Sequence, residues 1–98
     1  MNFGMFTDFH VRKGMSQPEA FDESFAQIIE AEKMGIDSVW LAEHHFSPDR
    51  SVLASPMVLC SALAARTSKI RIGMAVQVLP LTNPLRVAEE AATVDQIS

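Results

Sequence analysis

The strongest candidates for a reactive site are Glu43, His44 and His45, three consecutive residues whose side chains can carry protons or bind a metal. Imidazole titrates near neutrality, so a histidine here can act in proton transfer while Glu43 biases one ring. A metal site is the other chemistry that such a run suggests. Neighbouring side chains of extended backbone point to opposite faces, however, and chelating histidines use spacings such as i and i+4 on a helix. The run therefore favours proton transfer, and we expect no metal.

Several other candidate side chains have a simpler structural interpretation. For His45 and His10 we expect a hydrogen bond between the ring and a loop carbonyl. Cys60 lies among apolar residues, which is typical of a buried structural thiol, and a single cysteine can form no internal disulfide. Trp40 and Met34 are expected to pack in the core. The expected site therefore does not depend on these side chains.

Three apolar runs alternate with three amphipathic segments along the chain. The apolar runs predict strands at residues 2–7, 37–42 and 70–79. Their nearly continuous hydrophobicity is typical of strands that are buried on both faces. Strict βαβαβα alternation calls for a parallel sheet with right-handed crossovers, so the predicted fold class is parallel α/β without an internal domain boundary.

Each predicted helix begins at a capping signal. Ser16 and Glu19 form a capping box, in which each side chain satisfies a free amide at the start of a helix, and Gly35 ends that helix. Ser55 and Asn83 each precede a proline, which suits the first helical position. The signals predict helices that run from the capping box to Gly35, over residues 57–66, and from Asn83 towards the end of the chain.

The strand ends identify where a site would form. In parallel α/β folds, ligands bind at the carboxyl ends of the strands, because loops and helix N-termini with free amides converge there. The residues that the three strands deliver to this rim are Thr7, Asp8 and His10, then Glu43, His44 and His45, then Ala75, Val76 and Gln77, with Thr82 and Asn83 after them. All three sets are expected on one rim.

Composition limits the partners of the chain. Its 98 residues are 48% hydrophobic and 20% charged, which is typical of a compact fold. The net charge is −4 without a basic run, so nucleic acid is not expected. No stretch approaches the ~18 apolar residues that span a bilayer, and the first residues lack the charged start of a signal peptide. We therefore expect a cytoplasmic protein that does not bind membranes. No glycine-rich phosphate loop follows the first strand, which disfavours a dinucleotide-binding fold.

Three blocks of the sequence resemble bacterial luciferase and its flavin-dependent relatives. They are the run from Val39 to Phe46, the run from Gly73 to Pro80, and the run from Asn83 to Glu90 continuing to Ser98. The resemblance covers essentially the whole chain, and the Glu-His-His-Phe block at a strand end is its most specific part. It implies a (βα)₈ barrel of typically ~250 residues or more. Residues 1–98 would then be a single partial domain of three βα units, too short for the complete enzyme.

The resemblance also implies roles for the rim residues. His44 matches a histidine near the flavin ring and the substrate, where it can assist proton transfer, with Glu43 beside it. Ala75 and Val76 resemble a pair that relatives often join by a non-proline cis peptide beside the isoalloxazine ring, and Gln77 follows them in the same cofactor-binding segment. Asn83 stands where relatives often carry histidine. The implied cofactor is reduced FMN, which acts with O₂ on a small organic substrate such as an aldehyde.

Two other functions remain open from the sequence. One is a deazaflavin-dependent oxidoreductase of the same superfamily, which the rim residues do not distinguish from an FMN enzyme. The other is a non-catalytic, self-associating flavin-binding or interaction module. Three parallel strands leave two open sheet edges and an uncovered face, so a homo-oligomer with little activity of its own is expected.

Overall fold

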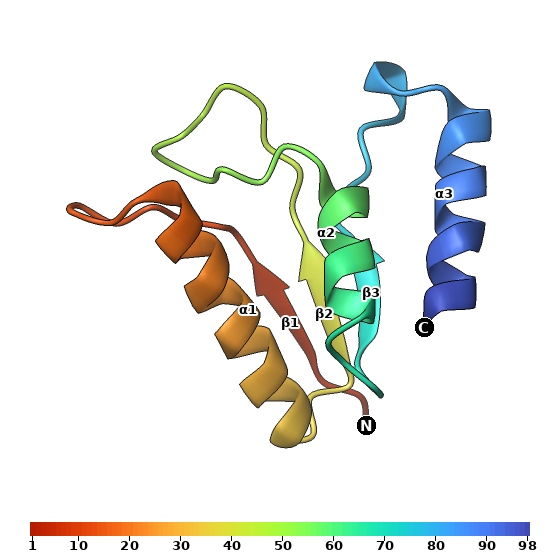
Figure 1. The fold of residues 1–98 in the computed structure, drawn as a ribbon, viewed down its shortest axis with the longest axis horizontal. Coiled ribbons are helices and arrows are strands. Elements are labelled where there is room, and N and C mark those ends of the chain that lie inside the picture. Colours follow the sequence, from red (N-terminus) through yellow and green to blue (C-terminus); the bar gives the residue numbers. More distant parts are fainter.

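A computed structural model of the chain describes all of residues 1–98. The elements are β1 Gly4–Thr7, α1 Gln17–Lys33, β2 Ser38–Leu41, α2 Pro56–Ala64, β3 Arg71–Met74, a short 3₁₀ turn Leu79–Leu81 and α3 Pro84–Ile97 (Figure 1). The strands form one sheet in the order β1-β2-β3, and both strand pairs are parallel. The predicted parallel βαβαβα order is confirmed.

The core lies between the sheet and the helices α1 and α2. Its buried apolar cluster consists of Phe9, Ile28, Val39, Leu41, Leu53, Leu59, Cys60, Leu63 and Ile70. Cys60 is therefore a buried thiol, as expected, and this burial raises its pKa. Figure 1 shows α3 beside α2 and away from β1 and β2. Consequently α3 buries no residue completely, and from its apolar stripe Val94 packs against the core cluster.

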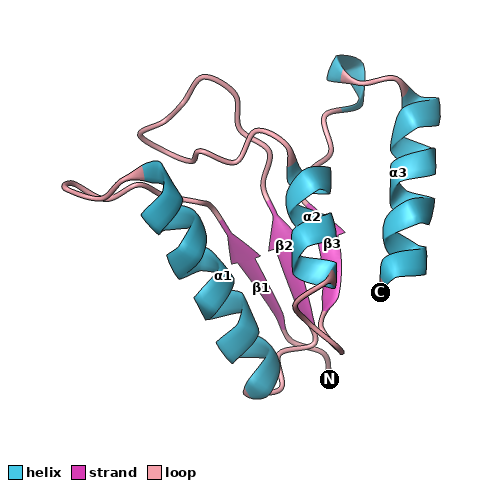
Figure 2. Ribbon diagram, viewed as in Figure 1, coloured by secondary structure: helices cyan, strands magenta, loops and turns pink.

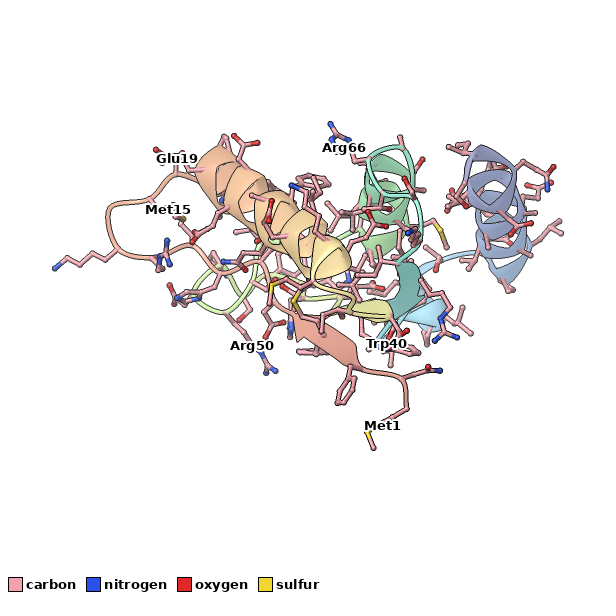
Figure 3. All side chains as sticks on the ribbon, turned by 90° about the horizontal axis from the view of Figure 1, so that it is seen from below. Met1, Met15, Glu19, Trp40, Arg50 and Arg66 are labelled. Atoms are coloured by element: carbon pink, nitrogen blue, oxygen red, sulfur yellow. The ribbon has the colours of Figure 1, made fainter.

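Two residues expected in the core are exposed. Trp40 lies opposite Phe6 in the β1–β2 register, and their exposed fractions are 45% and 56%. Trp40 alternates along β2 with buried Val39 and Leu41, so its side chain points to the face of the sheet that the helices leave open. Figure 3 shows the helices on one side of the sheet and Trp40 on the other. Met34 follows the last residue of α1 and is also exposed, so both core predictions were wrong.

The predicted capping signals of α1 and α3 are confirmed, whereas α2 ends at Ala64 rather than at residue 66. The capping box of Ser16 and Glu19 is formed at the start of α1, and Gly35 after that helix has a φ of 90°. Asn83 caps α3 by accepting a hydrogen bond from the amide of Leu85 at 2.9 Å. Ser55 precedes α2 as predicted but makes no side-chain capping bond.

The third strand is shorter than predicted. It ends at Met74, and the segment predicted to extend it to residue 79 leaves the sheet and turns at Leu79–Leu81. The amide of Ala75 still donates to the carbonyl of Leu41 at 2.7 Å, but the amide of Val78 donates to the Glu43 carboxylate. The strand ladder stops because a side chain takes the place of a neighbouring strand.

No helix of the protein combines the length and the apolar character that crossing a bilayer requires.

Candidate functional site at the strand ends

The three segments that follow the strands meet at one end of the sheet. Because the strands are parallel, their carboxyl ends all reach this rim, where Figure 2 shows the loops after β1 and β2 and the segment between β3 and α3. Two hydrogen bonds join the first loop to the second: the amide of Phe9 donates to Ser51 Oγ at 3.1 Å, and the amide of Val52 donates to the carbonyl of Phe9 at 2.9 Å. The predicted shared rim is confirmed.

His44 pairs with the carboxylate of Asp8. The distance between His44 Nε2 and Asp8 Oδ1 is 2.9 Å, and the side chains of the two residues are 19% and 29% exposed. The amide of His44 donates to the carbonyl of Leu53 at 2.9 Å, which holds the backbone that carries the ring. The sequence places Asp8 on the rim but indicates no role for it there. Its position directly after β1, beside a strand that is followed by two histidines, was the signal for this pair.

Glu43 lies on the other side of the same corner and is almost completely buried. Its side chain is 3% exposed, its Oε1 lies 2.6 Å from His45 Nε2, and its Oε2 accepts from the amide of Val78 at 2.8 Å. Both oxygens are therefore engaged. The expected bond from His45 to a loop carbonyl is wrong, because residues two apart in extended backbone share a face and bring His45 to Glu43. His10 does contact a loop carbonyl, that of Arg50, at 3.4 Å.

The segment after β3 carries the third part of the rim. The peptide bond between Ala75 and Val76 is cis, as the resemblance implied. Val76 is 63% exposed, so an apolar side chain faces solvent beside the rim. Gln77 Oε1 is a buried oxygen without a hydrogen-bond partner. The bond from Val78 to Glu43 places this segment next to the corner at His44. The site thus combines an imidazole with a carboxylate partner, an exposed apolar side chain and an unpaired acceptor.

The fold has a cavity away from the rim, and it has no cluster of side chains suited to a metal ion. No group of three His, Cys, Asp or Glu side chains converges in a way that could hold a metal ion. A cavity of about 650 Å³ lies between α2, β3 and α3, with Cys60, Ile72 and Val94 among its lining residues. None of the rim residues line this cavity. Apolar side chains predominate in its lining, and Lys69, Arg71 and Asp95 add charged groups.

Comparison with known proteins decides the family. The family model of the luciferase-like monooxygenases matches residues 1–98. This chain belongs to the luciferase-like monooxygenase family. It is 33% identical to the alkanal monooxygenase beta chain of Photobacterium leiognathi, in a match that covers 100% of this chain and 30% of that one. It is 35% identical to the alkanal monooxygenase alpha chain of Photorhabdus luminescens, covering 100% of this chain and 27% of that one.

Solved structures of luciferase-like proteins share the fold. The oxygenating constituent of 3,6-diketocamphane monooxygenase of Pseudomonas putida, solved in complex with FMN, is 27% identical with a TM-score of 0.88, covering 99% of this chain and 26% of that one. The monooxygenase RslO1 of Streptomyces bottropensis is 28% identical with a TM-score of 0.89, covering 100% of this chain and 30% of that one. The chain therefore spans less than a third of the length of each of these relatives. Its three βα units correspond to part of the family's (βα)₈ barrel.

Proposed function

We propose that this chain provides part of the active-site rim of a flavin-dependent monooxygenase, which uses reduced FMN and O₂ to oxidise a small organic substrate. One observation carries the proposal. The Asp8–His44 pair, the buried Glu43 and the segment from Ala75 to Gln77 lie on the same rim of a luciferase-like fold. Proton-transfer groups therefore lie beside an exposed apolar surface, which is an arrangement suited to redox chemistry on an aromatic cofactor.

The residues after β3 fit a flavin ring. An isoalloxazine ring needs apolar surface against its face and polar partners at its edge. Val76 offers exposed apolar surface, Ala75 adds little bulk beside it, and Gln77 Oε1 is an acceptor that lacks a donor. We assign these three residues to cofactor binding. Reduced FMN, when bound, supplies the electrons for the reaction with O₂.

The proton-handling groups divide into two roles. The imidazole of His44 is partly open to solvent, so it can give or take a proton at the rim. Glu43 is enclosed and supports the reaction through its partners, because its carboxylate holds both the ring of His45 and the backbone of Val78. The bond between Glu43 and the amide of Val78 also fixes the segment that carries Ala75 and Val76 relative to His44.

Flavin titration and variant kinetics of the intact protein test this proposal. We expect FMN to bind, and His44→Ala to lower kcat by about 100-fold, the scale of general acid–base catalysis. His10→Ala is the matched control, because the exposed ring of His10 makes a single hydrogen bond, with the carbonyl of Arg50. Absence of flavin affinity, or full turnover by His44→Ala, would contradict the proposal. Titration with a deazaflavin in parallel distinguishes the FMN enzyme from a deazaflavin-dependent oxidoreductase.

A further inference from the structure

We propose that Asp8 is a positioning residue that holds His44 in one neutral tautomer. In that tautomer Nε2 carries the proton and donates it in a hydrogen bond to Asp8, while Nδ1 keeps its lone pair for proton exchange at the rim. The assignment of the tautomer rests on the geometry of the pair alone. Its use in turnover rests on the proposed function.

The fold holds both partners in place from separate elements. Thr7 and Leu41 are register partners in the parallel sheet, so the residues that follow β1 and β2 leave the sheet side by side. Asp8 comes directly after β1, and the next residue is tied to Ser51 through its amide. The backbone of His44 is tied to the carbonyl of Leu53. The 2.9 Å contact between Nε2 and Oδ1 thus joins two side chains whose backbones are already fixed.

The chemistry of the two groups sets the direction of the hydrogen bond. An ionised carboxylate can only accept, so the nitrogen that contacts it must carry a proton. A neutral imidazole has one N–H, and placing it on Nε2 leaves Nδ1 unprotonated. The opposite tautomer would direct the lone pair of Nε2 against a negative oxygen. Asp8 therefore selects between the two tautomers by electrostatic repulsion of one and a charge-assisted bond to the other.

The free nitrogen remains available to a ligand. His44 Nδ1 has no hydrogen-bond partner within the chain. It is not a buried atom, so it reaches solvent. The carboxylate of Asp8 makes no other hydrogen bond within the chain. Glu43, by contrast, divides its two oxygens between His45 and the amide of Val78. Of the two carboxylate–histidine pairs, the one at His44 is suited to proton exchange.

Nitrogen-15 NMR of the histidine side chains tests the tautomer directly. The spectrum is recorded on the 98-residue chain at about pH 9, above the range in which histidine ordinarily titrates. His44→Gln assigns the ring, because its signals disappear in that variant. We expect one tautomer in the unmodified chain, with the proton on Nε2. In Asp8→Asn, the amide can present either its oxygen or its NH₂ group to the ring, so a mixture or the reversed tautomer is expected.

Asp22→Asn is the matched control, because it makes the same chemical change at an exposed position of α1. This variant is expected to keep the tautomer of the unmodified chain. A proton on Nδ1, protons on both nitrogens, or the same proportion of the two tautomers in Asp8→Asn as in the unmodified chain would overturn the proposal. Amide spectra of the variants show whether the fold is retained.

Kinetics of the intact protein test the positioning role. Asp8→Asn is expected to lower kcat by about 10- to 100-fold while flavin affinity stays within about twofold, because the pair handles protons and makes no hydrogen bond to the segment from Ala75 to Gln77. Full turnover by Asp8→Asn together with impaired His44→Ala would overturn this role. Full turnover by His44→Ala would instead count against the proposed function, and the tautomer measured by NMR would still stand.

Discussion

Asp8 and Glu43 each bind one histidine, but water reaches the two carboxylates to different extents. The side chain of Asp8 is 29% exposed and that of Glu43 is 3% exposed. A buried carboxylate must have its oxygens satisfied, and Glu43 meets this requirement with the ring of His45 and the amide of Val78. At the residue scale, burial thus distinguishes Glu43, which supports the structure of the rim, from the Asp8–His44 pair, which can exchange protons there.

Replacing Glu43 tests this supporting role. Glu43→Gln retains one acceptor oxygen and introduces an NH₂ group, so the ring of His45 and the amide of Val78 can no longer both contact a carboxylate oxygen. We expect the free energy of unfolding to fall by about 1–3 kcal/mol. Urea denaturation measures it, with Glu90→Gln at an exposed position of α3 as the control, for which a change within about 0.5 kcal/mol is expected. Equal losses in both variants would show that Glu43 has no special structural role.

At the scale of elements, a single side chain links α1 to the start of β3. Glu32 Oε1, near the end of α1, accepts from the amides of Ser68, Lys69 and Ile70 at 2.8, 2.6 and 2.9 Å. These bonds favour the ionised carboxylate, the one from Ile70 most, and they hold the pKa of Glu32 below its ordinary value of 4.5. The connection sets where β3 enters the sheet, and therefore where Ala75 and Val76 leave it.

Stability should depend on pH through Glu32. Its folded pKa is depressed, so its contribution is fully present above pH 4.5 and is lost as the pH falls through the folded pKa. We expect Glu32→Gln to lower the unfolding free energy by about 1 kcal/mol at pH 7, since partial exposure weakens each bond. At about pH 3 the difference should narrow, because glutamine resembles the protonated acid.

Thermal unfolding at the two pH values measures the effect of Glu32. Glu30→Gln on the same helix is the control, because Glu30 pairs only with the exposed Lys33, and such pairs contribute about 0–0.5 kcal/mol. A Glu32→Gln effect as large at pH 3 as at pH 7 would contradict the linkage.

At the scale of the whole molecule, the helices cover one side of the sheet and leave the other open. Phe6 and Trp40 lie side by side on the open face, and both strands at the edges of the sheet have unpaired backbone groups. The ring of Trp40 lies so close to Gly73 that a Cβ added there would come within 2.6 Å of it. This open face combines aromatic surface with free strand edges, which favours association of copies.

We therefore predict that the 98-residue chain self-associates and has little turnover of its own. Sedimentation should show oligomers whose fraction falls in Phe6→Ser, because this change removes apolar surface from the open face. Leu85→Ser, at an exposed apolar position of α3, is the control and should leave the oligomers unchanged. A monodisperse monomer of the unmodified chain, or robust turnover by it, would contradict the prediction.

The sequence alone determined the order and type of the elements and most of their starts. These features depend on local chemistry: Ser16 and Glu19 cap α1 across three residues, Asn83 caps α3 across two, and Gly35 takes the left-handed conformation that ends α1. The resemblance added the family and the cis bond between Ala75 and Val76, which residue patterns do not encode. Side chains close in sequence meet whatever the rest of the chain does, so their interactions can be predicted directly.

Only the tertiary structure decided which distant groups meet at the rim. Asp8 and His44 are 36 residues apart, and Glu43 and Val78 are 35 apart, so each contact requires the parallel register of two strands. The early end of β3 and the exposure of Trp40 have the same origin, since both depend on what the neighbouring strand or helix offers. Local patterns specify which side chains of a strand share a face. The assembled sheet determines which face the helices cover and which partner each polar group finds.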